Sequence, residues 1–236
     1  MMSTSVDARE SDQTLSQEGL QGPIRKPIAI TMGDPAGIGP EIILRALARA
    51  PETGLEGPFV VYGCPGWMEA VARRLGLNTG LLEVVPVTEV PEDLPVGQVS
   101  AAGGEAAFQA VYRAAQDAMA GKVRAVVTAP LSKAAMNLAG HVYPGHTEIL
   151  AEVGGNVPVR MMLANEELRT VLVSIHVPLG VAVSSLSTAG IVETIRLTDA
   201  FLRMTGIQAP RIAVAGINPH AGEDGLLGDE EIRVIG

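Results

Sequence analysis

Aromatic residues are scarce in this sequence: they make up 3% of a chain in which 47% of the residues are hydrophobic. The 236 residues suffice for a buried core, which must therefore be built from Val, Ile, Leu, Ala and Met. The 27 glycines and 16 prolines favour alternating strands and helices joined by tight turns. No uncharged apolar stretch reaches the roughly 20 residues of a membrane-spanning helix, which argues against a membrane protein.

Cysteine and positive charge are also in short supply. The single cysteine, Cys64, excludes an intrachain disulfide and a cysteine-rich zinc site, and we interpret it as a small buried hydrophobic residue. The formal net charge of -9 argues against a nucleic-acid-binding protein, which normally has a basic face. An anionic substrate is compatible with this charge, because a phosphate needs only a few local donors, and a helix N-terminus supplies some of them.

Common targeting and catalytic motifs are missing as well. Residues 1–25 are polar and lack the apolar segment of a signal peptide, so we expect a disordered tail and, by default, a cytoplasmic protein. The dinucleotide motif G-x-G-x-x-G and the nucleotide motif G-x-x-x-x-G-K-[ST] are absent. The hydrolase signatures Gly-x-Ser-x-Gly and His-Glu-x-x-His are absent too, which argues against hydrolase functions.

Strand and helix patterns alternate along the rest of the chain. This alternation predicts right-handed crossovers and a mainly parallel sheet, which is an α/β fold. The stretch 86–95, rich in proline and acidic residues, is the most linker-like internal segment. Strands are expected at 27–31, 59–62, 82–87, 125–128, 161–164, 170–175 and 212–215, and helices from Pro40 and at 66–75, 103–120, 146–153 and 188–205.

A glycine-rich loop, GDPAGIGPE at residues 33–41, follows the first expected strand. It could bind an anion through backbone N–H groups at a helix N-terminus, or it could be a tight strand–helix turn that needs glycine dihedral angles. Lys133, which follows another buried strand, could likewise meet a phosphate or carboxylate, or be a solvated loop lysine.

The four histidines occupy different contexts. His146 lies where a loop meets a helix start, whereas His176 and His220 each end an expected strand beside a proline. Ligands of open α/β sheets bind beyond the carboxyl ends of strands, and neutral imidazoles suit zinc and other divalent metals. The spacing matches no local metal motif, so each histidine could instead be an ordinary loop or core residue. His141 is given no role.

Five segments appear in the order and at the approximate spacing found in one known family, the 4-hydroxythreonine-4-phosphate dehydrogenases. The chain resembles this family from about residue 27 to its last residue, and five colinear motifs are far more specific than any one alone. The segments are ITMGDPAGIGPE (30–41), TAPLSK (128–133), GHTE (145–148), MMLA (161–164) and NPHAGE (218–223).

The resemblance implies a homodimer of chains that each have two α/β/α domains, related in fold to isocitrate and isopropylmalate dehydrogenases and not to Rossmann enzymes. This relation would explain the missing G-x-G-x-x-G. We expect the first domain at residues 26–130 and the second at residues 131–236. The resemblance places the active site in the interdomain cleft at the dimer interface.

The resemblance also implies roles for individual residues. His146 and Thr147 match the family's substrate-binding pair, and Lys133 is a further candidate for substrate binding. His176 and His220 match two of three metal-binding histidines, for a divalent ion such as zinc, magnesium or cobalt. The third belongs to a Tyr-His-Asp-Gln-like motif that this sequence does not contain. Because the last residues resemble the start of a helix, we expect the chain to be C-terminally incomplete.

The function that the resemblance implies is the NAD- or NADP-dependent oxidation of 4-phosphohydroxy-L-threonine to a 3-oxo acid. This acid decarboxylates to 3-amino-2-oxopropyl phosphate in pyridoxal phosphate synthesis. Close relatives oxidise phosphorylated four-carbon sugar acids or cis-dihydrodiol dicarboxylates, and the motifs separate these substrates poorly. A function of another class also stays open, in which the chain is an inactive fragment that serves as a binding module. Neither a nucleic acid nor a membrane is an expected partner.

Overall fold

The structure is a computed structural model that describes residues 25–77 and 82–236. It contains two compact units, one ending at Asn156 and the other running from Val157 to Gly236. The expected disordered tail, residues 1–25, lies outside the described residues except for Arg25. The first unit extends past the domain boundary expected after residue 130, and the division of the whole protein into domains stays a prediction.

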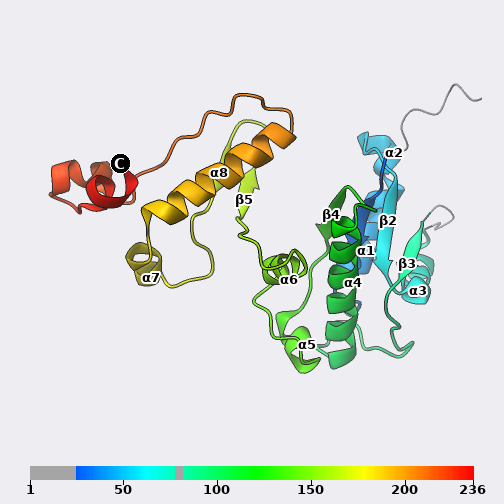
Figure 1. The fold of residues 1–236 in the computed structure, drawn as a ribbon. Helices are drawn as coiled ribbons and strands as arrows, with labels where there is room; N and C mark the ends of the chain where they lie inside the picture. Colours follow the sequence, from blue (N-terminus) through cyan, green and yellow to red (C-terminus); the bar gives the residue numbers. More distant parts are fainter. Residues whose placement is uncertain (1–24, 78–81) are drawn as a thin grey trace, which may run out of the picture. The chain divides into compact units, whose positions relative to one another are not determined.

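The first unit is built on a four-stranded parallel sheet (Figure 1). The strand order is β3-β2-β1-β4, so the first strand of the chain lies at the centre of the sheet. Ile28 of β1 is in register with Phe59 of β2 on one side and Ala125 of β4 on the other. The strands are β1 (Ile28–Thr31), β2 (Phe59–Gly63), β3 (Val84–Pro86) and β4 (Ala125–Thr128).

Helices follow the strands as the alternation predicts. The long helix α4 begins at a cap in which the Ser100 side chain accepts a hydrogen bond from the Gly103 N–H at 3.1 Å. Proline occupies the first turn of α1 and of α3, where its missing N–H costs nothing. The helices are α1 (Gly39–Ala48), α2 (Ala50–Thr53), α3 (Pro65–Leu75), α4 (Ala101–Met119), α5 (Lys133–Leu138) and α6 (His146–Val153).

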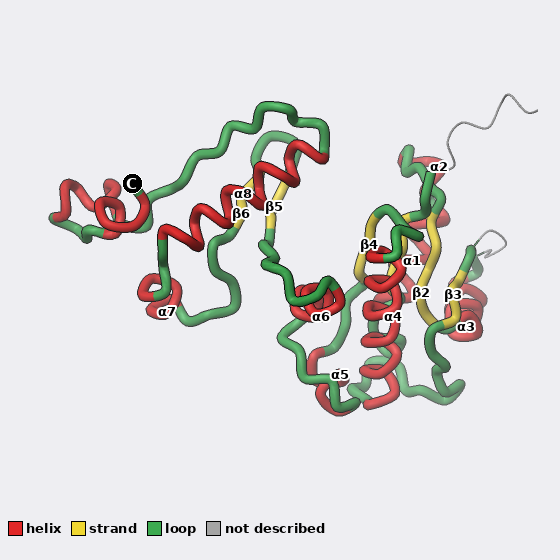
Figure 2. Tube along the Cα trace, viewed as in Figure 1, coloured by secondary structure: helices red, strands yellow, loops and turns green. Residues whose placement is uncertain are grey.

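Alternation of side chains along β2 shows how both faces of the sheet are covered. Val60 and Tyr62 pack with Ala110 and Ala114 of α4, whereas Val61 packs with residues of α1 and α3. The unit therefore has three layers, with α4 on one face and α1 and α3 on the other (Figure 2). This arrangement confirms the predicted α/β fold.

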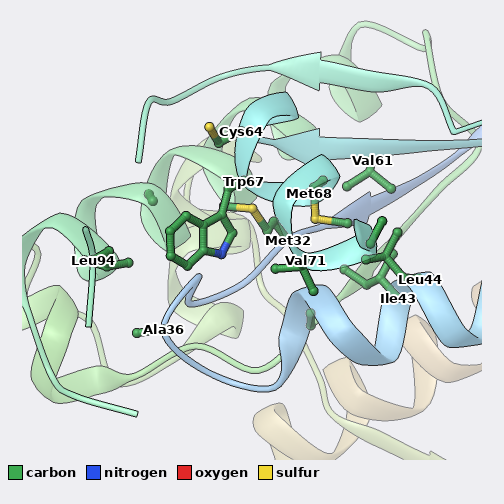
Figure 3. Close-up of a cluster of buried hydrophobic side chains, with 13 residues drawn as sticks. Met32, Ala36, Ile43, Leu44, Val61, Cys64, Trp67, Met68, Val71 and Leu94 are labelled. Carbon is green, nitrogen blue, oxygen red and sulfur yellow. The ribbon is translucent and has the colours of Figure 1, made fainter. Parts of the chain in front are cut away.

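The largest hydrophobic cluster lies between the sheet and α1 and α3, and includes Met32, Trp67 and Met68 (Figure 3). The Trp67 indole Nε1 donates a hydrogen bond to the Pro35 carbonyl at 3.0 Å, so the ring satisfies its polar atom while it fills the core. Leu94 belongs to the same cluster and is 7% exposed. Leu94 anchors residues 86–95, the most linker-like stretch of the sequence, in the core, and the two units do not divide there.

A buried carboxylate connects the sheet to α4. The Tyr62 hydroxyl donates to Asp117 Oδ2 at 3.0 Å, while Lys122 Nζ donates to Asp117 Oδ1 at 2.8 Å. Burial, together with the bond to the Asp117 carboxylate, raises the pKa of Tyr62 to about 12. Burial alone would raise the pKa of Asp117, but hydrogen bonds from Lys122, Tyr62 and Arg113 outweigh it and lower that pKa.

The end of the first unit packs on α4. Phe108 and Val111 of α4 form a cluster with Met136 of α5 and Ile149 of α6. A glycine permits the close approach of two helices here, because a Cβ at Gly104 would collide with the backbone carbonyl of Ala135. Helices α5 and α6 are thereby held in the first unit, and their N-termini carry three of the expected site residues.

The second unit consists of a short antiparallel hairpin and four helical segments. Arg160 connects the hairpin region to α8, because its Nε donates to Thr194 Oγ1 at 2.7 Å and its Nη2 to Glu193 at 2.6 Å. The elements are β5 (Met162–Ala164), β6 (Arg169–Val171), α7 (Leu179–Ser184), α8 (Thr188–Met204), the turn η1 (Pro219–Gly225) and the π-helix η2 (Glu231–Ile235).

One strand prediction is wrong in this unit, and another is confirmed only in part. Residues 212–215 form no strand, and the strand expected at 170–175 is shortened to β6. A ladder requires a neighbouring strand, and none within the described residues pairs with residues 212–215. The described part of the chain also contains no helix with both the length and the apolar character needed to cross a membrane.

Candidate functional site

The candidate site of the first unit lies at the carboxyl edge of its sheet. Because β1 and β4 are neighbours, the loops that follow them meet there: the Asp34 N–H donates to the Pro130 carbonyl at 3.0 Å. Gly33 has a φ of 71°, and a Cβ at this position would collide with the same carbonyl. Only glycine allows the two loops to approach so closely.

The glycine-rich loop uses much of its own hydrogen-bonding capacity internally. Asp34 Oδ1 accepts from the Ala36 N–H at 2.9 Å, and the Asp34 carbonyl accepts from the Gly37 N–H at 3.0 Å. Residues 32–36 are buried, and a Cβ at Gly39 would strike the Met32 carbonyl. Of the two alternatives for this loop, the structure favours the tight strand–helix turn.

The imidazole of His146 bonds to the loop after β4 and has one buried nitrogen without a hydrogen-bond partner among the described residues. It is the first residue of α6, and its imidazole has a hydrogen bond with the backbone of Ala129, in the loop after β4. Nε2 of the ring is buried and has no hydrogen-bond partner among the described residues, so the bond to Ala129 uses Nδ1. Burial lowers the pKa of His146 below its ordinary value of 6.5, although the bond to Ala129 opposes this shift. A neutral ring with one unused buried nitrogen is suited to a ligand.

Lys133 and Thr147 lie beside His146 in space. The Cε of Lys133 lies 4.0 Å from where a Cβ on Gly145 would sit, next to the first residues of α6. Lys133 is exposed and Thr147 is half-buried. The structure therefore brings together Lys133, His146 and Thr147, the three residues for which substrate binding is expected. An exposed ammonium group next to a helix N-terminus favours an anionic ligand.

The two expected metal ligands, His176 and His220, are exposed residues of the second unit. Both have left-handed backbone conformations, with φ of 57° and 52°. Among the described residues, no hydrogen bond or ion pair involves the His220 imidazole, so both of its nitrogens are available to a ligand. Imidazole donors suit zinc or cobalt.

The number of donors falls short of a complete metal site. Within residues 25–77 and 82–236, no group of three or more His, Cys, Asp or Glu side chains is arranged to hold a metal ion. Structural and catalytic zinc sites use at least three protein ligands. The imidazoles of His176 and His220 suit a divalent transition metal by their chemistry, but two donors do not make a complete metal site.

Sequence reasoning missed a carboxylate that contacts the loop carrying His220. From the sequence, the last residues were expected only to begin a helix. In the structure, Glu231 Oε1 accepts from the backbone N–H groups of Ile217, at 2.7 Å, and Asn218, at 2.8 Å. No local sequence signal indicates this contact, because the carboxylate and its donors lie on opposite sides of a turn.

Comparison with known proteins reveals extensive similarity. The family described as pyridoxal phosphate biosynthetic protein PdxA matches residues 47–236. A 4-hydroxythreonine-4-phosphate dehydrogenase of Beijerinckia indica is 46% identical over 224 residues, which are 89% of this chain and 66% of that protein. A D-threonate 4-phosphate dehydrogenase of Salmonella typhimurium is 44% identical over 228 residues, covering 89% of this chain and 69% of the relative.

Solved structures agree with these matches. The 4-hydroxythreonine-4-phosphate dehydrogenase of Klebsiella pneumoniae aligns with a TM-score of 0.81 at 40% identity, over 91% of this chain and 70% of that one. A terephthalate 1,2-cis-dihydrodiol dehydrogenase of Burkholderia xenovorans aligns with a TM-score of 0.62 at 34% identity, over 87% and 66%. The chain thus spans about two thirds of the length of the relatives it matches.

Proposed function

The chain belongs to the family described as pyridoxal phosphate biosynthetic protein PdxA, and on this premise we propose that its protein is a metal-dependent dehydrogenase of 4-phosphohydroxy-L-threonine. The reaction oxidises a secondary alcohol to a 3-oxo acid, which loses its carboxyl group to give 3-amino-2-oxopropyl phosphate. The observation that carries the proposal is the convergence of Lys133, His146 and Thr147 at the N-terminus of α6. This cluster occurs in a chain 46% identical to a relative that bears the name of this activity.

The substrate-binding role follows from the chemistry of this cluster. The Lys133 ammonium group and the N-terminus of α6 both attract an anionic group such as a phosphate or carboxylate. The unused Nε2 of His146 and the hydroxyl of Thr147 supply directional hydrogen bonds. Because the imidazole is fixed by its bond to Ala129, it orients the ligand without a large loss of side-chain entropy.

A divalent metal and NAD or NADP complete the proposed activity. His176 and His220 would hold the metal, as zinc, cobalt or magnesium, together with a further ligand from outside the described residues. When bound, the metal would supply stabilisation of a developing alkoxide, and the nicotinamide would be the hydride acceptor. The proposal includes a homodimer with the active site at its interface and a cytoplasmic location, both supported by the family resemblance.

The same site supports a second candidate substrate, D-threonate 4-phosphate. The relative named for that activity is 44% identical, nearly as similar as the one named for 4-hydroxythreonine 4-phosphate. Both compounds have a phosphate and a secondary alcohol, so the cluster around Lys133 serves either. The structural similarity to a terephthalate 1,2-cis-dihydrodiol dehydrogenase adds a cis-dihydrodiol as a third candidate substrate.

The decisive experiment measures formation of the reduced nicotinamide with each candidate substrate in turn, in the presence of Zn²⁺ and either NAD or NADP. We expect the highest kcat/KM with 4-phosphohydroxy-L-threonine, and a loss of about tenfold or more in His146→Ala, because a bond to a charged ligand is removed. His141→Gln is the matched control, since His141 pairs with Glu105 at 2.6 Å outside the cluster. Preference for D-threonate 4-phosphate or for a diol lacking phosphate would contradict the assignment.

The possibility of an inactive binding module is tested by calorimetric titration with the same substrates. Binding of a phosphorylated substrate that is weakened by His146→Ala, without any turnover, would identify the chain as a module that binds but does not react. No binding by a folded chain would contradict both functions.

A further inference from the structure

The glycine-rich loop after β1 packs against Ala129, the first residue after β4. Ala129 is 5% exposed, and its N–H donates to the Thr31 carbonyl at 3.3 Å, so the pairing of β4 with β1 extends to this residue. Its methyl group lies between two glycines of the loop. A Cβ at Gly33 would lie 3.1 Å from the Ala129 Cβ, and a Cβ at Gly39 would lie 3.3 Å from it. A side chain at either glycine would therefore displace Ala129.

The same loop also holds the backbone that follows Ala129. Gly33 has a left-handed backbone conformation, and a Cβ at this position would collide with the Pro130 carbonyl. The close approach allows a hydrogen bond, because the Asp34 N–H donates to that carbonyl at 3.0 Å. Ala129 is therefore held by β1 through its own N–H and by the loop through the carbonyl of the next residue.

Contacts from other elements fix the glycine-rich loop itself. The Trp67 indole of α3 donates to the Pro35 carbonyl at 3.0 Å, and the Gly97 N–H donates to the Ala36 carbonyl at 2.7 Å. Residues 32–36 are buried, so the loop cannot shift without disturbing the largest hydrophobic cluster. It is therefore a firm support for the backbone of Ala129.

The backbone of Ala129 in turn orients the imidazole of His146. Burial lowers the pKa of His146, and the hydrogen bond to Ala129 opposes this shift. A bond that favours the protonated ring is one that the ring donates, so its acceptor is the Ala129 carbonyl. Nε2 has no partner among the described residues, which identifies Nδ1 as the donor. In the neutral ring the single proton is then on Nδ1, and Nε2 is the acceptor nitrogen available to a ligand.

We propose that the glycine-rich loop positions the substrate-binding imidazole, with Ala129 as the positioning residue. Gly33 and Gly39 hold Ala129, and its carbonyl fixes the ring of His146 so that Nε2 is the nitrogen that binds the ligand. This inference rests on the proposed function, in which His146 binds the substrate. Ala129 acts through His146, because the hydrogen bond at one ring nitrogen sets the tautomer and the orientation of the other.

The first test determines the tautomer of His146 in the full chain by nitrogen NMR of labelled imidazoles, with His146→Ala to assign the signals. We expect Nδ1 to carry the proton at neutral pH and Nε2 to have the chemical shift of an unprotonated nitrogen. A proton on Nε2 in the folded chain would refute the inference. It would leave the substrate-binding role of His146 intact, since Nε2 would then bind the ligand as a donor.

The second test loosens the contact without removing the carbonyl. Ala129→Gly deletes the methyl group between Gly33 and Gly39, so we expect His146 to populate both tautomers. The dissociation constant for 4-phosphohydroxy-L-threonine, titrated calorimetrically with Zn²⁺ but without a nicotinamide cofactor, should rise about two- to tenfold. Ala29→Gly is the matched control, because Ala29 is a fully buried alanine of β1 outside the cluster. It should also lower the unfolding free energy, yet change neither the tautomer nor the affinity.

The outcomes separate this inference from the proposed function. If Ala129→Gly has the same tautomer and the same affinity as Ala29→Gly, the positioning role is refuted while substrate binding by His146 stands. If His146→Ala binds the substrate as tightly as the unsubstituted chain, both the substrate-binding role and the positioning role are refuted. The same holds if the folded, unsubstituted chain does not bind the substrate.

Discussion

The two compact units differ most in how much apolar surface they bury. All three hydrophobic clusters of the described residues lie in the first unit, between its sheet and its helices. In the second unit, one stripe of α8 supplies nearly all buried side chains: Ile191, Thr194, Thr198 and Leu202. An open pocket of about 230 Å³ lies between α8 and the hairpin, and Met162 and Phe201 help to line it. Similar local patterns therefore produced a dense core in one unit and a thin one in the other.

The difference shows that a strand pattern needs partners to become a strand. The apolar stretch at residues 28–31 lies between two parallel neighbours, while residues 212–215 have the same character and no ladder. Helix α8 forms in either circumstance, because its backbone hydrogen bonds are internal and Ser187 caps its first turn. Helices are thus specified locally, and strands are specified by the rest of the sheet.

The largest expected effect on this comparison is the loss of unfolding free energy when a buried side chain is shortened in each unit. Met68 is fully buried in the largest cluster, so we expect Met68→Ala to lower the unfolding free energy of the first unit by about 2–5 kcal/mol. Leu202→Ala should cost about 2 kcal/mol or less, because few neighbours surround α8 and the site can collapse. Urea unfolding followed by Trp67 fluorescence measures the first change, and hydrogen exchange in α8 the second. Equal losses would contradict the contrast in packing.

An intermediate effect is expected at two acidic residues on helices of the two units. Asp117→Ala leaves the buried Tyr62 hydroxyl without its acceptor, which should cost about 1–3 kcal/mol. Asp199→Ala removes an exposed ion pair with Arg203, worth only about 0.3–0.5 kcal/mol. Hydrogen exchange of the slowest exchanging amides in α4 and in α8 measures both decreases in unfolding free energy, so that the two can be compared directly. A larger loss in α8 than in α4 would reverse the comparison.

The smallest expected effect is a dependence of the unfolding free energy of the first unit on pH. Burial lowers the pKa of His146, so below about 6.5 the unfolded chain binds a proton more readily than the folded one. We therefore expect the unfolding free energy of the first unit to decrease as the pH falls through this value and toward the lowered pKa of the folded state. His146→Gln should flatten this dependence when Trp67 fluorescence is followed. A steeper dependence in the variant would contradict the assignment, and the same dependence in α8 exchange would mean that the units unfold together.

Sequence reasoning anticipated the candidate site unevenly. Lys133, His146 and Thr147 belong to short motifs at the ends of strands or starts of helices, and the parallel sheet brings such positions together. The metal role of His176 and His220 was expected from family resemblance, and it remains a prediction because the described residues assemble no complete site. Sequence spacing cannot show whether ligands that are far apart in the chain converge.

The residues that sequence reasoning missed act through tertiary contacts. Glu231 belongs to the last residues, which were expected only to begin a helix, yet its Oε1 accepts from the N–H groups of Ile217 and Asn218 across a left-handed turn. Leu94 lay in an apparent linker and is a core residue. The contacts of both side chains depend on the tertiary fold, which the local composition does not reveal.

The central position of β1 has a consequence for the order in which the protein can assemble during synthesis. Residues 28–31 leave the ribosome before β2, which can pair with them soon afterwards. The other edge of β1 must wait for β4, whose residues 125–128 emerge only after α4 has been made. Until then the nascent chain carries an open strand edge, the kind of surface that chaperones protect from aggregation. Placing the first strand at the centre of the sheet therefore couples completion of the first unit to the translation of its last strand.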